Sequence, residues 1–222
     1  MKIDFHVHTN ASIDSLIEPR LLAKKSTLLG IIPAIADHNS VSSHQEMREL
    51  GAPFIPAEEI FTDRGDLVGL YVNELIPKKT PFLEAIDRIH AQGGLAYIPH
   101  MFDYGRTGRH AGEHEAARAD IIEVFNARCL RQEYNRKAAE FARRHKIPGA
   151  CGSDSHLLFE FGSTYTLLPD FDIASPKALL RALKTRNPGL TTRPAPFYVR
   201  GTTTLVAKAR KLARMLAPPK PI

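Results

Sequence analysis

The chain has 222 residues, 43% of them hydrophobic and 24% charged, proportions of an ordinary globular protein that can form one large α/β domain or two small ones. No apolar run approaches the roughly 20 residues needed to cross a bilayer, so a transmembrane segment is excluded and a soluble protein is expected. The net charge of +6 comes from the C-terminal end, because no acid follows Asp172 and residues 1–172 carry −5, which argues against nucleic acid covering the whole protein.

Short apolar runs alternate with amphipathic stretches along most of the chain, which predicts repeated β–α units and a mostly parallel sheet. Between Pro81 and Gly93, for example, apolar residues recur at helical spacing. The expected strands lie near residues 2–8, 31–37, 54–60, 66–73, 94–99, 120–125, 148–153 and 163–168. The expected helices lie at 18–29, 41–50, 80–92, 130–146 and 175–185.

No internal repeat or linker divides residues 1–190, which predicts a single domain there. Prolines and glycines make residues 187–201 loop-like. A basic C-terminal extension, residues 191–222, is expected to form one amphipathic helix over 202–216 that packs on the barrel. Its bases could also dock on phosphates or on another acidic surface. The apolar stripe of that helix comprises Leu205, Ala209, Leu212 and Leu216.

The N-terminus and the cysteines predict a cytoplasmic protein. Asp4 places an acid where a signal peptide needs an apolar stretch. Cys129 and Cys151 are the only cysteines and form no CxxC pair, which suits reduced thiols in a reducing compartment.

Histidines and acids gather at the ends of the expected strands. His6 and His8 close the first strand, and side chains two residues apart on a strand point to the same side, so both imidazoles can reach one ion. In a parallel barrel the C-terminal strand ends open on one mouth, where such folds keep their chemistry. Asp14, in the loop after His8, is within reach of that mouth. Later strands end at His38, Glu59, His100, Asp154 and His156. A mixed imidazole and carboxylate set suits Zn, Mn or Fe better than Mg.

These residues form an ordered series of short motifs that resembles the PHP (polymerase and histidinol phosphatase) family over residues 2–156. The motifs are His-x-His at 6–8, Ser-x-Asp-Ser at 12–15, Asp-His-Asn at 37–39, Glu-Glu-Ile at 58–60, Pro-His at 99–100 and Gly-Ser-Asp-Ser-His at 152–156. The resemblance implies an α/β fold, a distorted (β/α) barrel of about seven strands, with two or three divalent metal ions at the C-terminal strand ends. It implies as ligands His6, His8, Asp14, His38, Glu59, His100, Asp154 and His156, with Glu59 bridging.

Several positions qualify this resemblance. Many relatives carry a further His where this chain has Asn126, which can ligate weakly or bond a bound water, so the number of metals stays open. Asp66 stands about where some relatives carry a His, and it is not expected to be a ligand. Asp37 is either an acceptor that orients a ligand imidazole or a simple turn residue. Glu58 is expected at the surface.

Three arginines follow the strands that end near His100 and Asn126, and they are candidate phosphate contacts because a guanidinium can bond two oxygens at once. They are Arg106, Arg109 and Arg128. The mechanism implied is phosphoester hydrolysis by a metal-activated water, with Asp154 as proton acceptor and Arg128 or Arg106 offsetting phosphoryl charge.

The expected substrate is a small phosphorylated metabolite or a nucleotide. One alternative is a 3′–5′ exonuclease on DNA or RNA ends, with the basic extension gripping the backbone. An alternative of another class is a non-catalytic, metal-stabilised module that docks through its basic tail.

Overall fold

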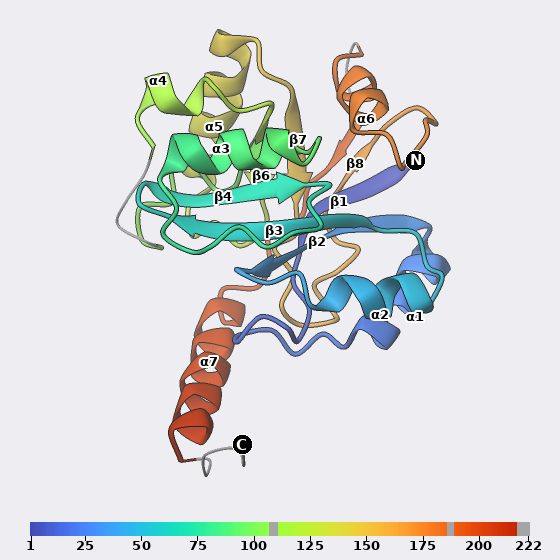
Figure 1. Ribbon diagram of the computed structural model, residues 1–222, viewed down its shortest axis with the longest axis vertical. Coiled ribbons are helices and arrows are strands. Elements are labelled where there is room, and N and C mark those ends of the chain that lie inside the picture. The colour runs from blue at the N-terminus through green and yellow to red at the C-terminus, as the bar shows by residue number, and fades with distance from the viewer. Residues whose placement is uncertain (107–110, 186–188, 217–222) are drawn as a thin grey trace.

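The computed structural model describes residues 1–106, 111–185 and 189–216, and Figure 1 shows a strongly curved sheet with helices packed outside it. Arg109 lies outside the described residues. Within those ranges no helix combines the length and the apolar character required to span a bilayer.

Nine strands form one sheet over the described residues, in the order β7-β6-β5-β4-β3-β2-β1-β8-β9. The strands are β1 (Lys2–Val7), β2 (Ile31–His38), β3 (Ile55–Thr62), β4 (Gly65–Leu70), β5 (Leu95–Ile98), β6 (Ile121–Asn126), β7 (Gly149–Gly152), β8 (Tyr165–Leu167) and β9 (Gly189–Thr191).

The sheet curls almost into a barrel because the segment after β7 returns to β1. Val7 bridges Ser155 in parallel, and the amide of Asp154 donates to the carbonyl of His6 at 2.8 Å. The α/β class and the barrel-like closure are confirmed, but the strand count is nine instead of about seven. The two additional strands extend the sheet from the other edge of β1: Lys2 and Ile3 pair with β8, which in turn pairs with β9.

The expectation of a mostly parallel sheet is only partly met. β1, β2 and β3 run parallel, as do β5, β6 and β7. β4 is antiparallel to β3, because only Asp63 and Arg64 separate the two strands and a parallel crossover needs a dozen or more residues. β4 is also antiparallel to β5.

The helices follow the expected pattern with short corrections at their ends, except for the short helix at Glu113–Ala116, which was not expected. α3 begins after Pro81 and buries Phe82, Ile86 and Ile89 against the sheet, and α1 ends where Gly30 adopts a φ of 61°. The helices are α1 (Pro19–Leu29), α2 (Ser43–Glu49), α3 (Phe82–Ala91), α4 (Glu113–Ala116), α5 (Gln132–His145), α6 (Pro176–Leu183) and α7 (Val199–Leu216).

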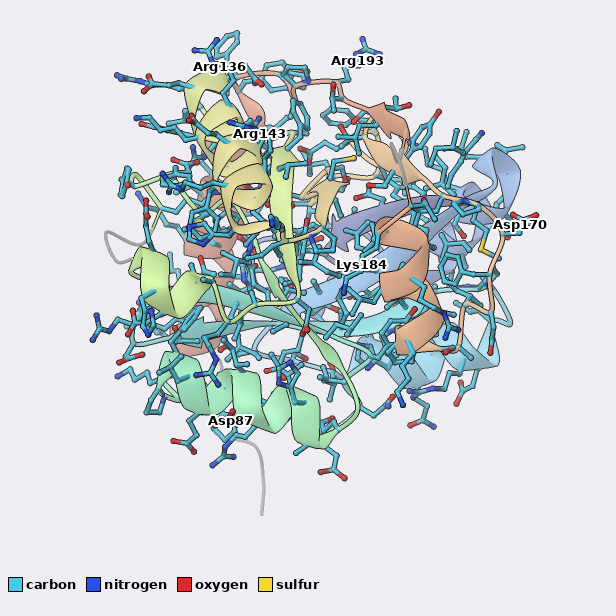
Figure 2. The ribbon with its side chains drawn as sticks, turned by 90° about the horizontal axis from the view of Figure 1, so that it is seen from above. Asp87, Arg136, Arg143, Asp170, Lys184 and Arg193 are labelled. Carbon is cyan, nitrogen blue, oxygen red and sulfur yellow. The ribbon has the colours of Figure 1, made fainter. Side chains whose placement is uncertain are left out.

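Apolar side chains fill the barrel and the spaces between sheet and helices. Phe5 and Tyr97 lie inside the barrel with their ring centroids 6.0 Å apart, and both side chains are fully buried. Charged side chains such as Asp87 and Arg136 lie at the periphery (Figure 2). The packed interior therefore leaves the rim formed by the strand ends for polar chemistry.

The C-terminal helix begins earlier than the sequence suggests and faces the body differently. β9 lies in the expected loop, and α7 starts at Val199 and extends away from the barrel (Figure 1). Its body-side face buries Val199 and Thr203, whereas Leu205 and Leu212 of the apolar stripe are 68% and 57% exposed. The helix contacts the body through polar anchors described below.

Candidate metal centre

The imidazoles and acids expected at the strand ends meet at one rim of the barrel. Glu59, at the end of β3, lies at their centre. Its Oε2 is 3.5 Å from Nε2 of His6, 3.5 Å from Nε2 of His8 and 2.8 Å from Nδ1 of His38. Its Oε1 is 3.1 Å from Nε2 of His100.

Two further acids complete the cluster from the loops after β1 and β7. Asp154 Oδ1 lies 3.3 Å from Nε2 of His8 and 3.8 Å from Nε2 of His6. Asp14 Oδ2 lies 3.2 Å from Nε2 of His156 and 3.5 Å from Nε2 of His38. All eight residues predicted as ligands are thus side by side.

The donor set fits divalent metal ions. Four overlapping groups of His, Asp and Glu each place one ligand atom per residue within 4.8 Å of the others; among them are His8 with His38 and His156, and His6 with His100 and Asp154. Buried polar atoms are normally hydrogen-bonded, because an unpartnered one costs about 1–3 kcal/mol. Five atoms of this cluster are buried and, despite close approaches, form no hydrogen bond of regular geometry among the described residues: His6 Nε2, His8 Nε2, Asp14 Oδ1, Glu59 Oε2 and Asp154 Oδ1.

Hydrogen bonds behind His6 and His8 turn the Nε2 lone pair of each ring toward the cluster. Glu123 Oε1 can only accept, so Nδ1 of His6, 3.2 Å away, must donate. Ser12 Oγ donates to Asp37 at 2.7 Å and therefore accepts from Nδ1 of His8 at 3.2 Å. Burial, and then the charges of His156 and His38, lower the pKa of His8 to about 3, so the ring is neutral and can ligate.

Two site residues hold unusual backbone conformations. His100 has a φ of 31° and Asp154 a φ of 55°, values that non-glycine residues rarely adopt. The amide of His100 donates to Glu123 Oε2 at 2.6 Å, and the carbonyl of Asp154 accepts from Nδ1 of His156 at 2.8 Å. Such strain persists where surrounding contacts hold it, and it gathers at functional sites.

Comparison with known proteins identifies the family. A family model described as PHP-associated matches residues 132–188. An uncharacterised protein of Methanocaldococcus jannaschii is 38% identical over 195 residues, covering 83% of this chain and 79% of its own. A Bacteroides vulgatus structure, described as a two-domain protein containing a predicted PHP-like metal-dependent phosphoesterase, superposes with a TM-score of 0.70 at 18% identity. The chain belongs to the PHP family.

Two of the solved structures that share this fold are longer than this chain. The match covers 87% of this chain but only 65% of the Bacteroides vulgatus protein. The lesion-specific endonuclease Q of Pyrococcus furiosus matches with a TM-score of 0.59 at 16% identity, over 85% of this chain and 57% of its own. These likenesses establish the fold.

Glu123 is the residue of this PHP site that sequence reasoning missed. Its carboxylate also accepts from the hydroxyl of Tyr97 and from Nδ2 of Asn126, each at 2.9 Å, in addition to His6 and the amide of His100. The signal was an acid inside the apolar β6 strand Ile-Ile-Glu-Val-Phe-Asn, where a buried charge requires partners.

Two other acids differ from expectation. Asp66 was not expected to be a ligand, but one of its carboxylate oxygens lies within 4.8 Å of ligand atoms of Glu59 and His100. Burial, and then the charge of Glu59, raise its pKa. Glu58, expected at the surface, is completely buried, because β3 is covered on both faces; its Oε2 accepts from the amide of Ile76 at 2.9 Å.

The arginines and Asn126 lie behind or beside the PHP cluster. Arg106 Nη1 is 2.6 Å from Asp154 Oδ2, and its Nη2 donates to Asn126 at 3.2 Å. Asn126 also donates to Asp154 at 3.2 Å, so its amide supports the acid from behind. Arg128 is almost fully buried: Nε donates to Glu160 at 3.0 Å, and Nη1 lies 3.1 Å from Nδ1 of His156. Arg128 therefore helps to hold the side chain of Glu160 in position.

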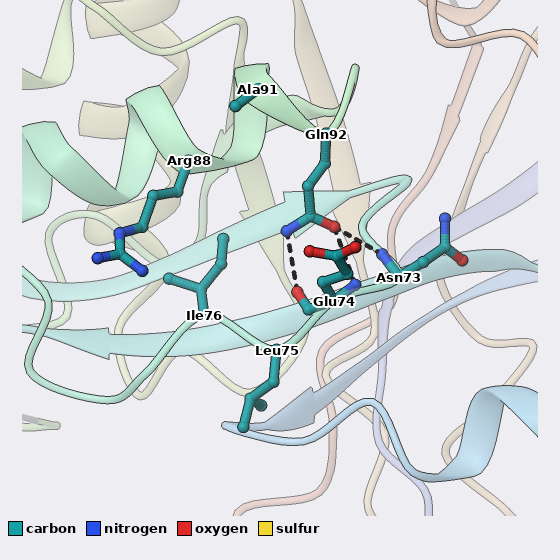
Figure 3. Close-up of a pocket in the computed structure, with 7 residues that line it drawn as sticks. All are labelled: Asn73, Glu74, Leu75, Ile76, Arg88, Ala91 and Gln92. Carbon is teal, nitrogen blue, oxygen red and sulfur yellow. Dashed lines mark hydrogen bonds between the residues drawn. The ribbon is translucent and has the colours of Figure 1, made fainter.

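A cavity of about 460 Å³ opens beside the cluster. Glu59, His156, Arg106 and Arg200 are among the residues that line it. A second cavity of about 420 Å³ lies by α3, where the Gln92 side chain bonds the backbone of Asn73 and Glu74 (Figure 3). None of the four candidate ligand groups found among the described residues includes a residue that lines this second cavity.

Proposed function

We propose that the chain is a metal-dependent phosphoesterase that hydrolyses a small phosphorylated metabolite or nucleotide with water. The observation that carries the proposal is the group of five buried ligand atoms of the cluster that form no hydrogen bond of regular geometry among the described residues. A donor set of this kind would suit Mn, Zn or Fe ions, which the residues around Glu59 would hold. When bound, two close divalent cations supply Lewis acidity, which lowers the pKa of water and offsets phosphoryl charge.

The protein's own residues would orient the reaction. Asp154 is the proposed proton acceptor: Arg106 and Asn126 engage its Oδ2, while its Oδ1 faces the cluster. Burial alone would raise the pKa of Asp154, but the charges of Arg106 and His6 hold it well below its ordinary value. Arg106 lines the cavity and would contact the phosphate. Arg128 would keep α7 in place and, through Glu160, which accepts from the amide of His156, the backbone of His156.

A second candidate is cleavage at the end of a DNA or RNA strand. It is favoured by the basic helix α7, which borders the cavity, and by the fold shared with endonuclease Q, which is known in complex with a 27-mer duplex. Phosphate contacts along a strand would make binding weaken steeply with salt, whereas binding of a small substrate would change little.

The test is a substrate panel with metal-reconstituted protein. Wild type loaded with Mn or Zn should release phosphate from phosphomonoesters, and His8→Ala should abolish turnover, because a ligand of the cluster is lost. His114→Ala, at an exposed position of α4, is the matched control. If no monoester or diester is cleaved while metal still raises Tm, the proposal fails and a non-catalytic, metal-stabilised module docking through its basic tail takes its place.

A further inference from the structure

The C-terminal helix α7 is held to the body by polar contacts along one of its faces. Nη2 of the buried Arg128 donates to the carbonyl of Val199 and to Oγ1 of Thr203, each at 3.1 Å. About two turns after Thr203, Nη1 of Arg210 donates to the carbonyl of Ser15 at 2.8 Å. The helix is therefore fixed to the body at two points, although it extends away from the barrel (Figure 1).

The apolar stripe of α7 points away from this body-side face. Leu205 follows Thr203 by two residues and Leu212 follows Arg210 by two residues, and a step of two residues turns about 200° around a helix. The exposed fractions agree, because Thr203 is buried whereas Leu205, Leu212 and Leu216 are each more than half exposed. The described residues of the body thus leave the stripe largely uncovered.

Two aromatic side chains extend the apolar surface at the start of the helix. Phe197 is 90% exposed and Tyr198 is 53% exposed, and their rings meet edge to face with centroids 5.8 Å apart. The carbonyl of Tyr198 accepts from the amide of Thr202 at 3.0 Å, so Tyr198 joins the first turn and lies two turns before Leu205, in line with the stripe. Exposed aromatic rings beside an apolar helix face are typical of segments at a membrane–water interface.

The charge around the stripe is positive. Lys208 and Lys211 are exposed on α7, and α7 contains no acid. Residues 173–222 as a whole contain 11 lysines and arginines and no aspartate or glutamate. This combination fits an anionic lipid surface, because burial of leucines among lipid chains and attraction of lysines to the headgroups add to one another.

A second copy of the chain fits this surface less well. A stable protein interface takes about 20–30 residues from each partner, whereas the stripe and the two aromatic residues supply six. Pairing of two α7 stripes would also bring Lys208 and Lys211 of both copies together, with no acid of α7 to compensate them. A lipid surface has neither requirement.

We propose that α7 docks on the surface of a membrane that contains anionic lipids, with its apolar stripe inserted among the lipid chains and Lys208 and Lys211 at the headgroups. Arg128 and Arg210 keep the opposite face on the body, so docking needs no rearrangement of these contacts. The proposal concerns where the protein binds and is independent of the reaction at the metal centre.

The test is flotation of full-length, metal-loaded protein with vesicles of pure phosphatidylcholine, or of phosphatidylcholine and phosphatidylglycerol in equal parts. Wild type should float with the mixed vesicles and bind pure phosphatidylcholine much more weakly. Leu205→Gln/Leu212→Gln should reduce partitioning into the mixed vesicles by about tenfold or more, because two leucines no longer favour the lipid. Lys208→Gln/Lys211→Gln should reduce it by about tenfold at low salt and by less at high salt.

Two matched controls carry the same substitutions at exposed positions of the body. Leu28→Gln/Leu130→Gln and Lys24→Gln/Lys177→Gln should both float as wild type does. All eight side chains are exposed, so Tm should change little in any of the four variants.

The outcomes that overturn the proposal are distinct. One is wild type that floats with neither kind of vesicle. Another is binding that Leu205→Gln/Leu212→Gln leaves unchanged, since bases alone adsorb to any polyanion. Equal binding to neutral and mixed vesicles overturns the assignment to anionic lipid. A dimer in sedimentation equilibrium that the leucine variant converts to monomer assigns the stripe to a second copy instead. Flotation does not depend on turnover, so the test stays decisive if no phosphoester is cleaved and the proposed function fails.

Discussion

Glu123→Gln tests whether the hydrogen bonds behind the ligands create the metal site. The carboxylate accepts four hydrogen bonds, from the side chains of His6, Tyr97 and Asn126 and from the amide of His100. A glutamine of the same shape has one accepting oxygen, and its amide group would face two donors. Two charge-assisted bonds of about 1.5–3 kcal/mol each are therefore lost.

Only part of this lost hydrogen-bond energy is expected to lower the metal affinity, because the ligand side chains themselves remain. Loss of a partner behind a ligand typically reduces metal affinity about 10–100-fold, which corresponds to about 1.4–2.8 kcal/mol. We expect this reduction for Zn in competition with a chromophoric chelator. Glu140→Gln, at an exposed position of α5, should behave as wild type. A Glu123→Gln protein that folds normally and binds zinc within twofold of wild type would refute the reasoning.

Three further predictions concern stability and the motif glycine. Burial raises the pKa of Glu58 from 4.5 to about 7, so ionisation of Glu58 destabilises the fold as pH rises through this range. In urea titrations, Glu58→Gln should have the same unfolding free energy as wild type near pH 4. At pH 8 the unfolding free energy of the variant should be higher by up to about 3 kcal/mol. Gly152→Ala should abolish metal binding, because a Cβ there would collide with Glu123 and His6, whereas Gly201→Ala meets nothing within 4 Å and should raise stability by about 0.5–1 kcal/mol. Truncation after Pro196 should lower Tm and activity together, because it removes the acceptors of the buried Arg128; unchanged activity would show that α7 is dispensable.

The sequence predicted that these histidines and acids meet at one rim, because their signal is local. A histidine or acid that directly follows an apolar run identifies a strand end, and parallel strands bring such ends together. His6 and Glu59 could be placed in this way before any coordinates were known. Antiparallel β4 was not foreseen, because apolar periodicity does not record strand direction.

Supporting residues were harder to predict because their roles depend on contacts between distant segments. Glu123 lies 117 residues from His6, and nothing near either residue in the sequence indicates that their side chains meet. Arg128 was interpreted as a phosphate contact because it follows β6. Its guanidinium lines the cavity and also donates to Val199 of α7, more than 70 residues farther along the chain.

The uneven charge of the sequence has a local counterpart in the fold. The body carries an excess of acids, and several of them, including Glu59, Asp103 and Asp154, are buried at one rim, where like charges repel unless cations compensate. The basic extension returns to that rim: Arg200 pairs with Asp103, and Arg210 holds the loop of Asp14. Because Glu59 and Asp154 keep unpartnered oxygens even with α7 in place, the helix compensates the outer acids and leaves the inner ones for metal ions.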